Sequence, residues 1–204
     1  MKASIILLLF FFLGLSSCNQ KISTKKSAIQ TIVLGGGCYW CVEAVYQRLE
    51  GVVEVIPGFA GGDLPNPTYE DVSLGNTGHV EVVKISYDEN KINLMRLLKV
   101  FFTVHDPTTL NRQGADVGIQ YRSVIFFENP NQSKIANNII DTLNKSKAFD
   151  RPIVTTVEPL KIFYKAPVEH FNYYNQNKNK PYCRIVIQPK IEKLERLFSE
   201  LLKE

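Results

Sequence analysis

Few cysteines, no basic run and no long hydrophobic segment are found in this chain of 204 residues. Four cysteines are too few for a disulfide-stapled scaffold, and none has the paired Cys/His spacing of a zinc finger. Lysine and arginine are scattered without a run of five, and the net charge is only +4, so no nucleic-acid partner is expected. The composition, 45% hydrophobic and 22% charged, is that of a globular protein and excludes wholesale disorder.

The N-terminal segment predicts export rather than a membrane span. Its apolar run, Ile5–Leu13, is nine residues long, whereas a membrane-spanning helix needs roughly 20. A run of this length behind Lys2 fits the hydrophobic part of an export signal. It is followed by Leu15-Ser16-Ser17-Cys18, which resembles the bacterial lipobox, in which the cysteine is lipidated and becomes the new N-terminus. An ordinary signal peptide with a chance cysteine is the alternative.

This interpretation divides the chain into three regions. Residues 1–17 are expected to be a lipoprotein signal peptide, residues 18–30 the lipidated Cys18 with a polar tether, and residues 31–204 one folded catalytic domain. We therefore expect the protein in a bacterial cell envelope, held on the periplasmic side or at the outer membrane by a lipid anchor. A monomer is expected.

The fold class predicted for residues 31–204 is α+β, a single domain with a mixed or antiparallel sheet and flanking helices. Strands or extended segments are expected at Thr31–Leu34, Val53–Gly62, His79–Tyr87, Tyr121–Phe127, Pro152–Val157 and Leu160–Phe163. Helices are expected from Cys38 or Tyr39 to about Leu49, over Asn93–Phe102, after Asn129-Pro130, and over Ile191–Leu202. The stretches Leu64–Thr77 and Val104–Gln120 are expected to be mainly loop.

Cys38 is the candidate nucleophile. It follows Gly35-Gly36-Gly37 and lies at or just before the N-terminus of the first predicted helix, where unpaired backbone N–H groups stabilise an anion. The thiolate is the reactive form, so this position is expected to lower the pKa of the thiol. The glycines also let another molecule approach the backbone. A buried, inert cysteine is the alternative.

Cys38 and Cys41 form a Cys-x-x-Cys pair, which occurs in thiol redox enzymes and in metal sites. A metal site needs two further soft ligands. Cys183 is one candidate, but the three histidines show no paired spacing with it, so no metal is expected. Two other interpretations stay open at this point: a thioredoxin-like disulfide oxidoreductase of the envelope, and a non-catalytic envelope lipoprotein with a structural Cys38–Cys41 bridge.

Several sequence blocks occur here in an order that one known family shares. They are Gly36-Gly37-Cys38-Tyr39-Trp40-Cys41-Val42-Glu43, Gly58-Phe59-Ala60-Gly61-Gly62, Pro65-Asn66-Pro67-Thr68-Tyr69, Gly75–Val83, His105-Asp106-Pro107-Thr108 and Gln113–Ser123. With these blocks, which span Gly35 to about Phe126, the chain resembles the peptide methionine sulfoxide reductases of the A class. Weaker similarity continues to Lys190. The resemblance implies a ferredoxin-like core.

The resemblance also implies a reaction, the thiol-based reduction of the S epimer of methionine sulfoxide, protein-bound and free. By position, Cys38 is the attacking thiolate and Glu81 is the proton donor. The alternating pattern independently places Glu81 on one strand face with Val83, Ile85 and Tyr87. Burial on that face would raise the pKa of the carboxyl and keep a proton on it near neutrality.

Five further residues match substrate-contacting positions of the family. The hydroxyls of Tyr69 and Tyr121 correspond to the two that bind the sulfoxide oxygen, and Asp116 to an acid that helps to hold substrate and water. Tyr39 and Trp40 correspond to the aromatic pair that cages the substrate methyl group. Phenylalanine is usual at the position of Tyr39, so the hydroxyl adds a polar edge to the ring.

Two segments depart from the family pattern. Ala166–Phe171 lacks the usual acidic residues and glutamine, and we assign no catalytic role to His170. Many members end in a glycine-rich tail with recycling cysteines, where this chain has a predicted helix.

Recycling is therefore expected through Cys41, Cys183 or an external thiol, with a thioredoxin-like reductant and no bound cofactor. We expect Cys41 to close first on Cys38, because three residues of separation favour a small-ring disulfide. Cys183 follows the polar stretch Asn172–Lys180, whose flexibility could bring it to the site. Alternatively, Cys183 is a strand residue held away from the site.

Overall fold

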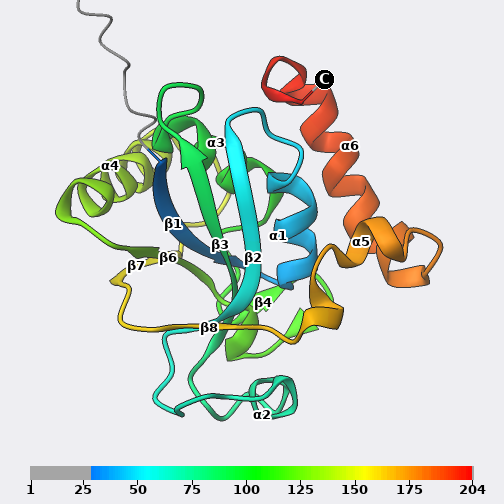
Figure 1. The fold of residues 1–204 in the computed structure, drawn as a ribbon. Coiled ribbons are helices and arrows are strands. Elements are labelled where there is room, and N and C mark those ends of the chain that lie inside the picture. The colour runs from blue at the N-terminus through cyan, green and yellow to red at the C-terminus, as the bar shows by residue number, and fades with distance from the viewer. Residues whose placement is uncertain (1–28, 204) are drawn as a thin grey trace, which may run out of the picture.

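The computed structural model describes residues 29–203 (Figure 1). The predicted signal peptide, Cys18 and most of the predicted tether lie outside these residues. The first strand begins at Ile29, slightly earlier than the predicted Thr31. No helix in the described part of the chain is long and apolar enough to cross a membrane.

The core of the molecule is a strand–helix–strand–strand–helix–strand unit. Its elements are β1 (Ile29–Gly36), α1 (Tyr39–Tyr46), β2 (Val52–Ala60), β3 (Val80–Asp88), α3 (Leu94–Val104) and β6 (Ser123–Phe127). These four strands are antiparallel in the order β6-β1-β3-β2, with the two later strands β7 (Thr156–Pro159) and β8 (Phe163–Lys165) at the edges. Only β7 is parallel to its neighbour. The predicted α+β class and mixed sheet are confirmed, and the strand order is that of a ferredoxin-like core.

Shorter elements connect and flank this core. They are α2 (Tyr69–Ser73), β4 (Arg112–Gln113), β5 (Asp116–Val117), η1 (Ile119–Tyr121), α4 (Pro130–Lys145), η2 (Val168–His170), α5 (Tyr173–Gln176), η3 (Cys183–Ile187), α6 (Gln188–Leu197) and η4 (Ser199–Leu201). Figure 1 shows α1, α5 and α6 on one side of the molecule and α4 on the other.

Both faces of the sheet are buried. One face of β3, with Val83 and Ile85, packs in the main core with the helices, whereas Val80 and Val82 belong to a smaller apolar cluster. The segment between β7 and β8 packs against that smaller cluster through Leu160. Because a strand sends alternate side chains to opposite faces, Glu81 points to the helix-covered side.

Side-chain caps explain where several helices begin. Asn93 precedes α3 and Asn129 precedes α4, and each accepts a hydrogen bond from a backbone N–H of the first turn. Thr68 forms a reciprocal capping box with Asp71, which starts α2 inside the stretch predicted to be mainly loop.

Three predicted strands need correction. Tyr121 ends the 3₁₀ turn η1, and β6 begins only at Ser123. Just before β7 the backbone is hydrogen-bonded outside the sheet, because the N–H of Val154 donates to the carbonyl of Pro107. The strand β7 therefore begins at Thr156 and not at the predicted Pro152. The next predicted strand was Leu160–Phe163. Leu160 instead packs against the smaller apolar cluster, and β8 begins only at Phe163.

Candidate active site

Cys38 occupies the N-cap of α1, at the turn that follows β1. The turn requires Gly37, whose φ of +91° lies in the left-handed region and whose missing Cβ would stand 2.6 Å from the Cγ atom of Gln113. Gln113 thus packs directly on the backbone that carries the thiol.

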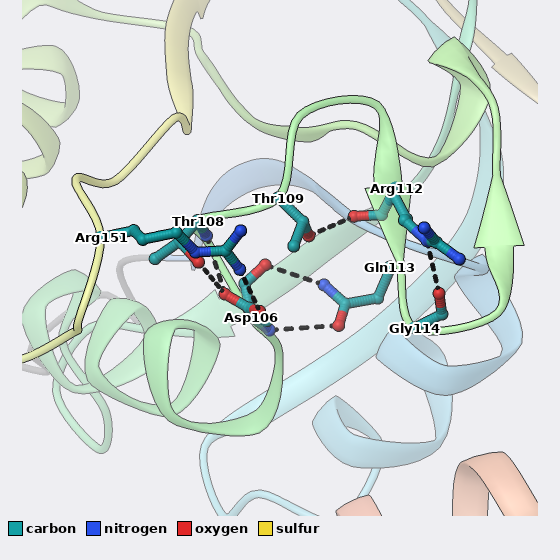
Figure 2. Close-up of polar contacts among 7 residues, drawn as sticks. All are labelled: Asp106, Thr108, Thr109, Arg112, Gln113, Gly114 and Arg151. Atoms are coloured by element: carbon teal, nitrogen blue, oxygen red, sulfur yellow. Dashed lines mark hydrogen bonds and ion pairs between the residues drawn. The ribbon is translucent and has the colours of Figure 1, made fainter.

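The loop that supplies Gln113 is itself fixed by polar contacts (Figure 2). The Gln113 side-chain amide donates to the carbonyl of Asp106 at 3.0 Å and accepts from the Asp106 N–H at 3.2 Å. The Asp106 carboxylate accepts from Thr108 and lies 3.8 Å from the Arg151 guanidinium. The two sequence blocks around Asp106 and Gln113 therefore pack against the Gly37 turn that positions Cys38.

The side chains around Cys38 enclose a cavity of about 70 Å³. It is lined by Cys38, Tyr39, Trp40, Tyr69, Glu81, Asp116, Tyr121 and Tyr182. All seven residues predicted to act on the substrate are thus brought together by α1, α2, β3, β5 and η1. Tyr182 is the one lining residue that the sequence reasoning missed, although it stands next to Cys183, which was singled out.

Glu81 reaches the cavity from β3 and is 2% exposed. Its Oε2 atom accepts a hydrogen bond from the Tyr39 N–H at 3.1 Å, so the carboxyl sits against the first turn of α1. Burial raises the pKa of Glu81 to about 8, and hydrogen bonds from the Tyr39 N–H and the Cys38 thiol only partly offset that effect. The carboxyl is therefore largely protonated at pH 7 and able to donate a proton.

The thiol of Cys38 does not have the lowered pKa that its place at a helix N-terminus predicts. Burial raises the pKa of Cys38 well above its ordinary value, and the neighbouring Cys41 and Glu81 raise it further. A hydrogen bond with Tyr182 acts in the opposite direction. The resting site therefore holds a neutral thiol, because the loss of solvation outweighs the helix terminus.

Two phenol groups from different elements line the cavity beside Cys38. Tyr69 is the first residue of α2 and Tyr121 is the last residue of η1. Burial is the main cause that raises the pKa of each phenol, so both hydroxyls keep their protons at neutral pH. Each can donate a hydrogen bond to an oxygen atom in the cavity.

Tyr182 links the cavity to the second cysteine of the pair. Its hydroxyl donates to the Oδ2 atom of Asp116 at 2.7 Å and lies 3.8 Å from the Cys41 sulfur. A hydrogen bond with Cys38 lowers the pKa of Cys41 to about 7, although burial opposes the shift. Cys41 is therefore the thiol of the pair that ionises more readily.

Cys183 begins η3, a π-helical turn, and is completely buried. It is not a strand residue, because the chain from Pro181 onward winds directly into α6. The preceding polar stretch is held rather than loose, since Asn172 donates its N–H to Glu43 and Arg48 donates to Asn175. Burial raises the pKa of Cys183, and the charge of the nearby Cys41 raises it further.

The described residues include three free cysteines, namely Cys38, Cys41 and Cys183. Within residues 29–203, no group of three or more histidine, cysteine or carboxylate side chains could hold a metal ion. Two adjacent thiols beside a protonated carboxyl, on an α+β domain, form the arrangement of a thiol-dependent oxidoreductase.

The chain belongs to the peptide methionine sulfoxide reductase family, whose sequence profile matches residues 30–201. The MsrA enzyme of Trichodesmium erythraeum is 51% identical over 172 residues, which cover 84% of this chain and 97% of that protein. The enzyme of Saccharolobus solfataricus is 49% identical over 175 residues, covering 86% of this chain and 98% of its own.

Solved structures show the same relationship. Reduced Mxr1 from Saccharomyces cerevisiae is similar with a TM-score of 0.69 and 34% identity, covering 76% of this chain and 89% of its own. Methionine sulfoxide reductase A of Corynebacterium diphtheriae has a TM-score of 0.66 and 35% identity, covering 75% and 77%. The predicted family and enzyme class are confirmed: this chain is an oxidoreductase that acts on methionine sulfoxide by thiol chemistry. The thioredoxin-like and non-catalytic alternatives receive no support from these comparisons.

Proposed function

We propose that the chain reduces the S epimer of methionine sulfoxide, free and within proteins, with Cys38 as nucleophile and Glu81 as proton donor. One observation carries the proposal: a thiol, a protonated carboxyl and two phenol hydroxyls line a single small cavity. A cavity of this size takes the end of one side chain, such as a methylsulfinyl group.

The first step forms a bond between the sulfur of Cys38 and the sulfoxide sulfur. Glu81 gives its proton to the sulfoxide oxygen as negative charge develops on it, and the carboxylate that remains takes up the proton of the Cys38 thiol. Tyr69 and Tyr121 donate hydrogen bonds to the same oxygen. Transfer of the oxygen to the Cys38 sulfur then breaks both the bond between the two sulfurs and the sulfur–oxygen bond of the substrate. Methionine is released, so the substrate sulfur is reduced and Cys38 is oxidised to a sulfenic acid.

The second step regenerates the thiol. Cys41 attacks the sulfur of the Cys38 sulfenic acid, a disulfide forms and water leaves. The contact between the Cys38 and Cys41 side chains favours this order over a direct attack by Cys183. Cys183 then exchanges with Cys41, which frees the Cys38 thiol, and a thioredoxin-like dithiol reduces the resulting Cys41–Cys183 disulfide. No bound cofactor is required.

The fixed positions of the lining groups also support the epimer preference. A sulfoxide sulfur is chiral, so its oxygen and methyl group point in set relative directions. Tyr69 and Tyr121 bind the oxygen, whereas Tyr39 and Trp40 contact the methyl group. Only one epimer of the sulfoxide can make both sets of contacts. Asp116, bonded to Tyr182, completes the polar side of the cavity.

We further propose that the protein acts in a bacterial cell envelope as a lipoprotein. The support is the sequence alone: an apolar run of export length followed by Leu15-Ser16-Ser17-Cys18. Oxidised proteins of that compartment would be its substrates and repair after oxidative stress its role.

The deciding experiment compares Cys38→Ser and Cys41→Ser with the wild type, using separate epimers of N-acetylmethionine sulfoxide and dithiothreitol. Wild-type protein should reduce the S epimer and act poorly on the R epimer. Cys38→Ser should be inactive, while Cys41→Ser should still form one methionine per enzyme in a single turnover. Retained turnover in Cys38→Ser, or equal rates on the two epimers, would end the proposed mechanism.

A further inference from the structure

Tyr39 and Trp40 are held from outside the cavity by the segment Val168–Tyr174, which we call the strap. From the strap, the Nδ1 atom of His170 lies 2.8 Å from the Tyr39 hydroxyl. The same imidazole ring stacks on Trp40, with ring centroids 5.5 Å apart and an angle of 23° between planes. One side chain therefore contacts both members of the aromatic pair.

The strap makes a second contact with the indole. The ring of Tyr173 lies on Trp40 with centroids 3.6 Å apart and planes 5° from parallel. The strap is anchored to α1, since the buried Glu43 carboxylate accepts from the N–H of Asn172 at 2.8 Å. Asn172 has a φ of +52°, a left-handed conformation that asparagine tolerates better than most residues.

We propose that His170 is a positioning residue for substrate binding: it fixes the Tyr39 ring through the hydroxyl bond and the Trp40 ring through stacking, and so sets the wall that receives the methyl group. The inference rests on the proposed function and adds a specificity determinant to it. His170 does not line the cavity and contacts no reacting atom, so its effect passes through the side chains it touches. These are Tyr39, Trp40 and also Tyr69, whose ring centroid lies 4.5 Å from that of the imidazole.

The hydroxyl of Tyr39 is the group through which the strap holds this ring. A phenylalanine ring at position 39 would have no hydroxyl to bond His170. The Tyr39 ring is fully buried, so its hydroxyl needs a partner. Burial lowers the pKa of His170, which leaves the ring neutral at pH 7 with one nitrogen free to accept the phenol proton.

The test is a double-mutant cycle of Tyr39→Phe and His170→Phe, assayed on the S epimer of N-acetylmethionine sulfoxide. Both substitutions keep an aromatic ring and remove the same hydrogen bond. Tyr46→Phe is the matched control, because it removes another buried phenol hydroxyl of α1, one that donates to the Leu97 carbonyl at 2.8 Å.

Tyr39→Phe and His170→Phe should each raise KM about 3- to 10-fold, the effect of one lost hydrogen bond, with kcat within about 2-fold. The double variant should be no worse than either single one, since the bond is lost only once. The control should keep the wild-type KM. Additive effects in the double variant, an unchanged KM, or an equal rise of KM in the control would overturn the proposal.

A second measurement is independent of activity. Trp40 is the only tryptophan of the chain, so its fluorescence reports on this wall alone. Acrylamide should quench Trp40 more strongly in Tyr39→Phe and His170→Phe than in the wild type and in Tyr46→Phe. Equal quenching in all four proteins would refute the positioning role. If the wild type reduced no sulfoxide, the proposed function would fail while the quenching data still decided this inference.

Discussion

The carboxyl of Glu81 shows how two opposing effects are resolved at one residue. The N–H of Tyr39 and the N-terminus of α1 favour the charged form, an effect of about 0.3 to 1 kcal/mol for a surface group. Burial favours the neutral form, and it prevails, because the pKa of Glu81 rises to about 8. Burial by the sheet and the helix therefore keeps the Glu81 carboxyl protonated at neutral pH.

We expect Glu81→Gln to slow the first, reductive step by about 10²- to 10⁴-fold, the usual effect of losing a positioned general acid. In the wild type, the rate of this step should fall as the pH rises through about 8, because the acid then loses its proton. Stopped-flow measurement of methionine formation under single-turnover conditions would check both points. Wild-type speed in Glu81→Gln would show that the proton comes from elsewhere.

The same group gives a stability control for that variant. The pKa of Glu81 is raised in the folded state, so the folded protein binds more protons than the unfolded chain between pH 4.5 and about 8. This contribution to stability is full below pH 4.5 and is lost as the pH rises towards 8. Glu81→Gln should therefore melt no lower than the wild type at pH 8, which separates a catalytic defect from a folding defect.

Sequence reasoning located the reactive residues but not their ionisation. The alternation of β3 placed Glu81 on one face with Val83, Ile85 and Tyr87, but the pattern alone favoured an exposed glutamate, and only the family resemblance predicted a buried carboxyl with a raised pKa. For Cys38 the local pattern predicted a lowered pKa, and the prediction was wrong because burial, which the local pattern does not reveal, raises the pKa instead. Tyr182 was missed because only the fold brings η3 beside α1.

At the scale of elements, α1 and η3 determine how oxidation leaves Cys38. Cys38 and Cys41 are separated by one turn at the start of α1, and the Cys41 N–H donates to the Cys38 carbonyl at 3.1 Å. A disulfide between them requires little movement of α1. Cys183 belongs to a different element that packs beside this turn.

We therefore expect peptide mapping after one equivalent of substrate to find mainly a Cys38–Cys41 disulfide. In Cys183→Ser that bond should still form, but turnover with thioredoxin should slow. In Cys41→Ser the sulfenic acid should persist long enough to be trapped by dimedone. A dominant Cys38–Cys183 bond, with full thioredoxin-dependent turnover in Cys41→Ser, would contradict the proposed order.

Elements with local signals were predicted well, and those set by distant contacts were not. Asn93 and Asn129 mark the starts of α3 and α4 in the sequence as in the structure. The capping signal of α2, Thr68 with Asp71, was present but hidden among prolines and glycines. The strands after residue 150 shifted, because contacts with Pro107 and the smaller apolar cluster decide where they pair.

At the scale of the whole molecule, the location of the enzyme is open to a direct test. We expect Cys18→Ala to release the protein from membranes, since the substitution removes the only thiol of the lipobox-like motif. Cys38→Ser is the matched control and should stay with the membrane fraction. Fractionation and the mass of the mature N-terminus would check this. Unchanged fractionation without an acyl mass would reject the lipoprotein proposal.

The whole fold was predictable in class because its core follows one continuous run of alternating helices and strands, from β1 to β6. The strands at the two sheet edges could not be placed from the sequence. The strands β7 and β8 lie at opposite edges of the sheet, and a single connecting segment reaches both. That path depends on which apolar face remains uncovered once the core has formed.

The closeness of Cys41 to Cys38 also bears on how long the enzyme survives. A sulfenic acid that meets a second oxidant becomes a sulfinic acid, which ordinary thiols do not restore. Cys38 is only 6% exposed, and the neighbouring Cys41 thiol competes with the oxidant for its sulfenic form. Peroxide, the kind of agent that generates methionine sulfoxide, therefore has a narrow interval in which to inactivate the protein. The placement of two cysteines within one helical turn therefore protects the enzyme against inactivation by oxidants, in addition to its effect on the rate of recycling.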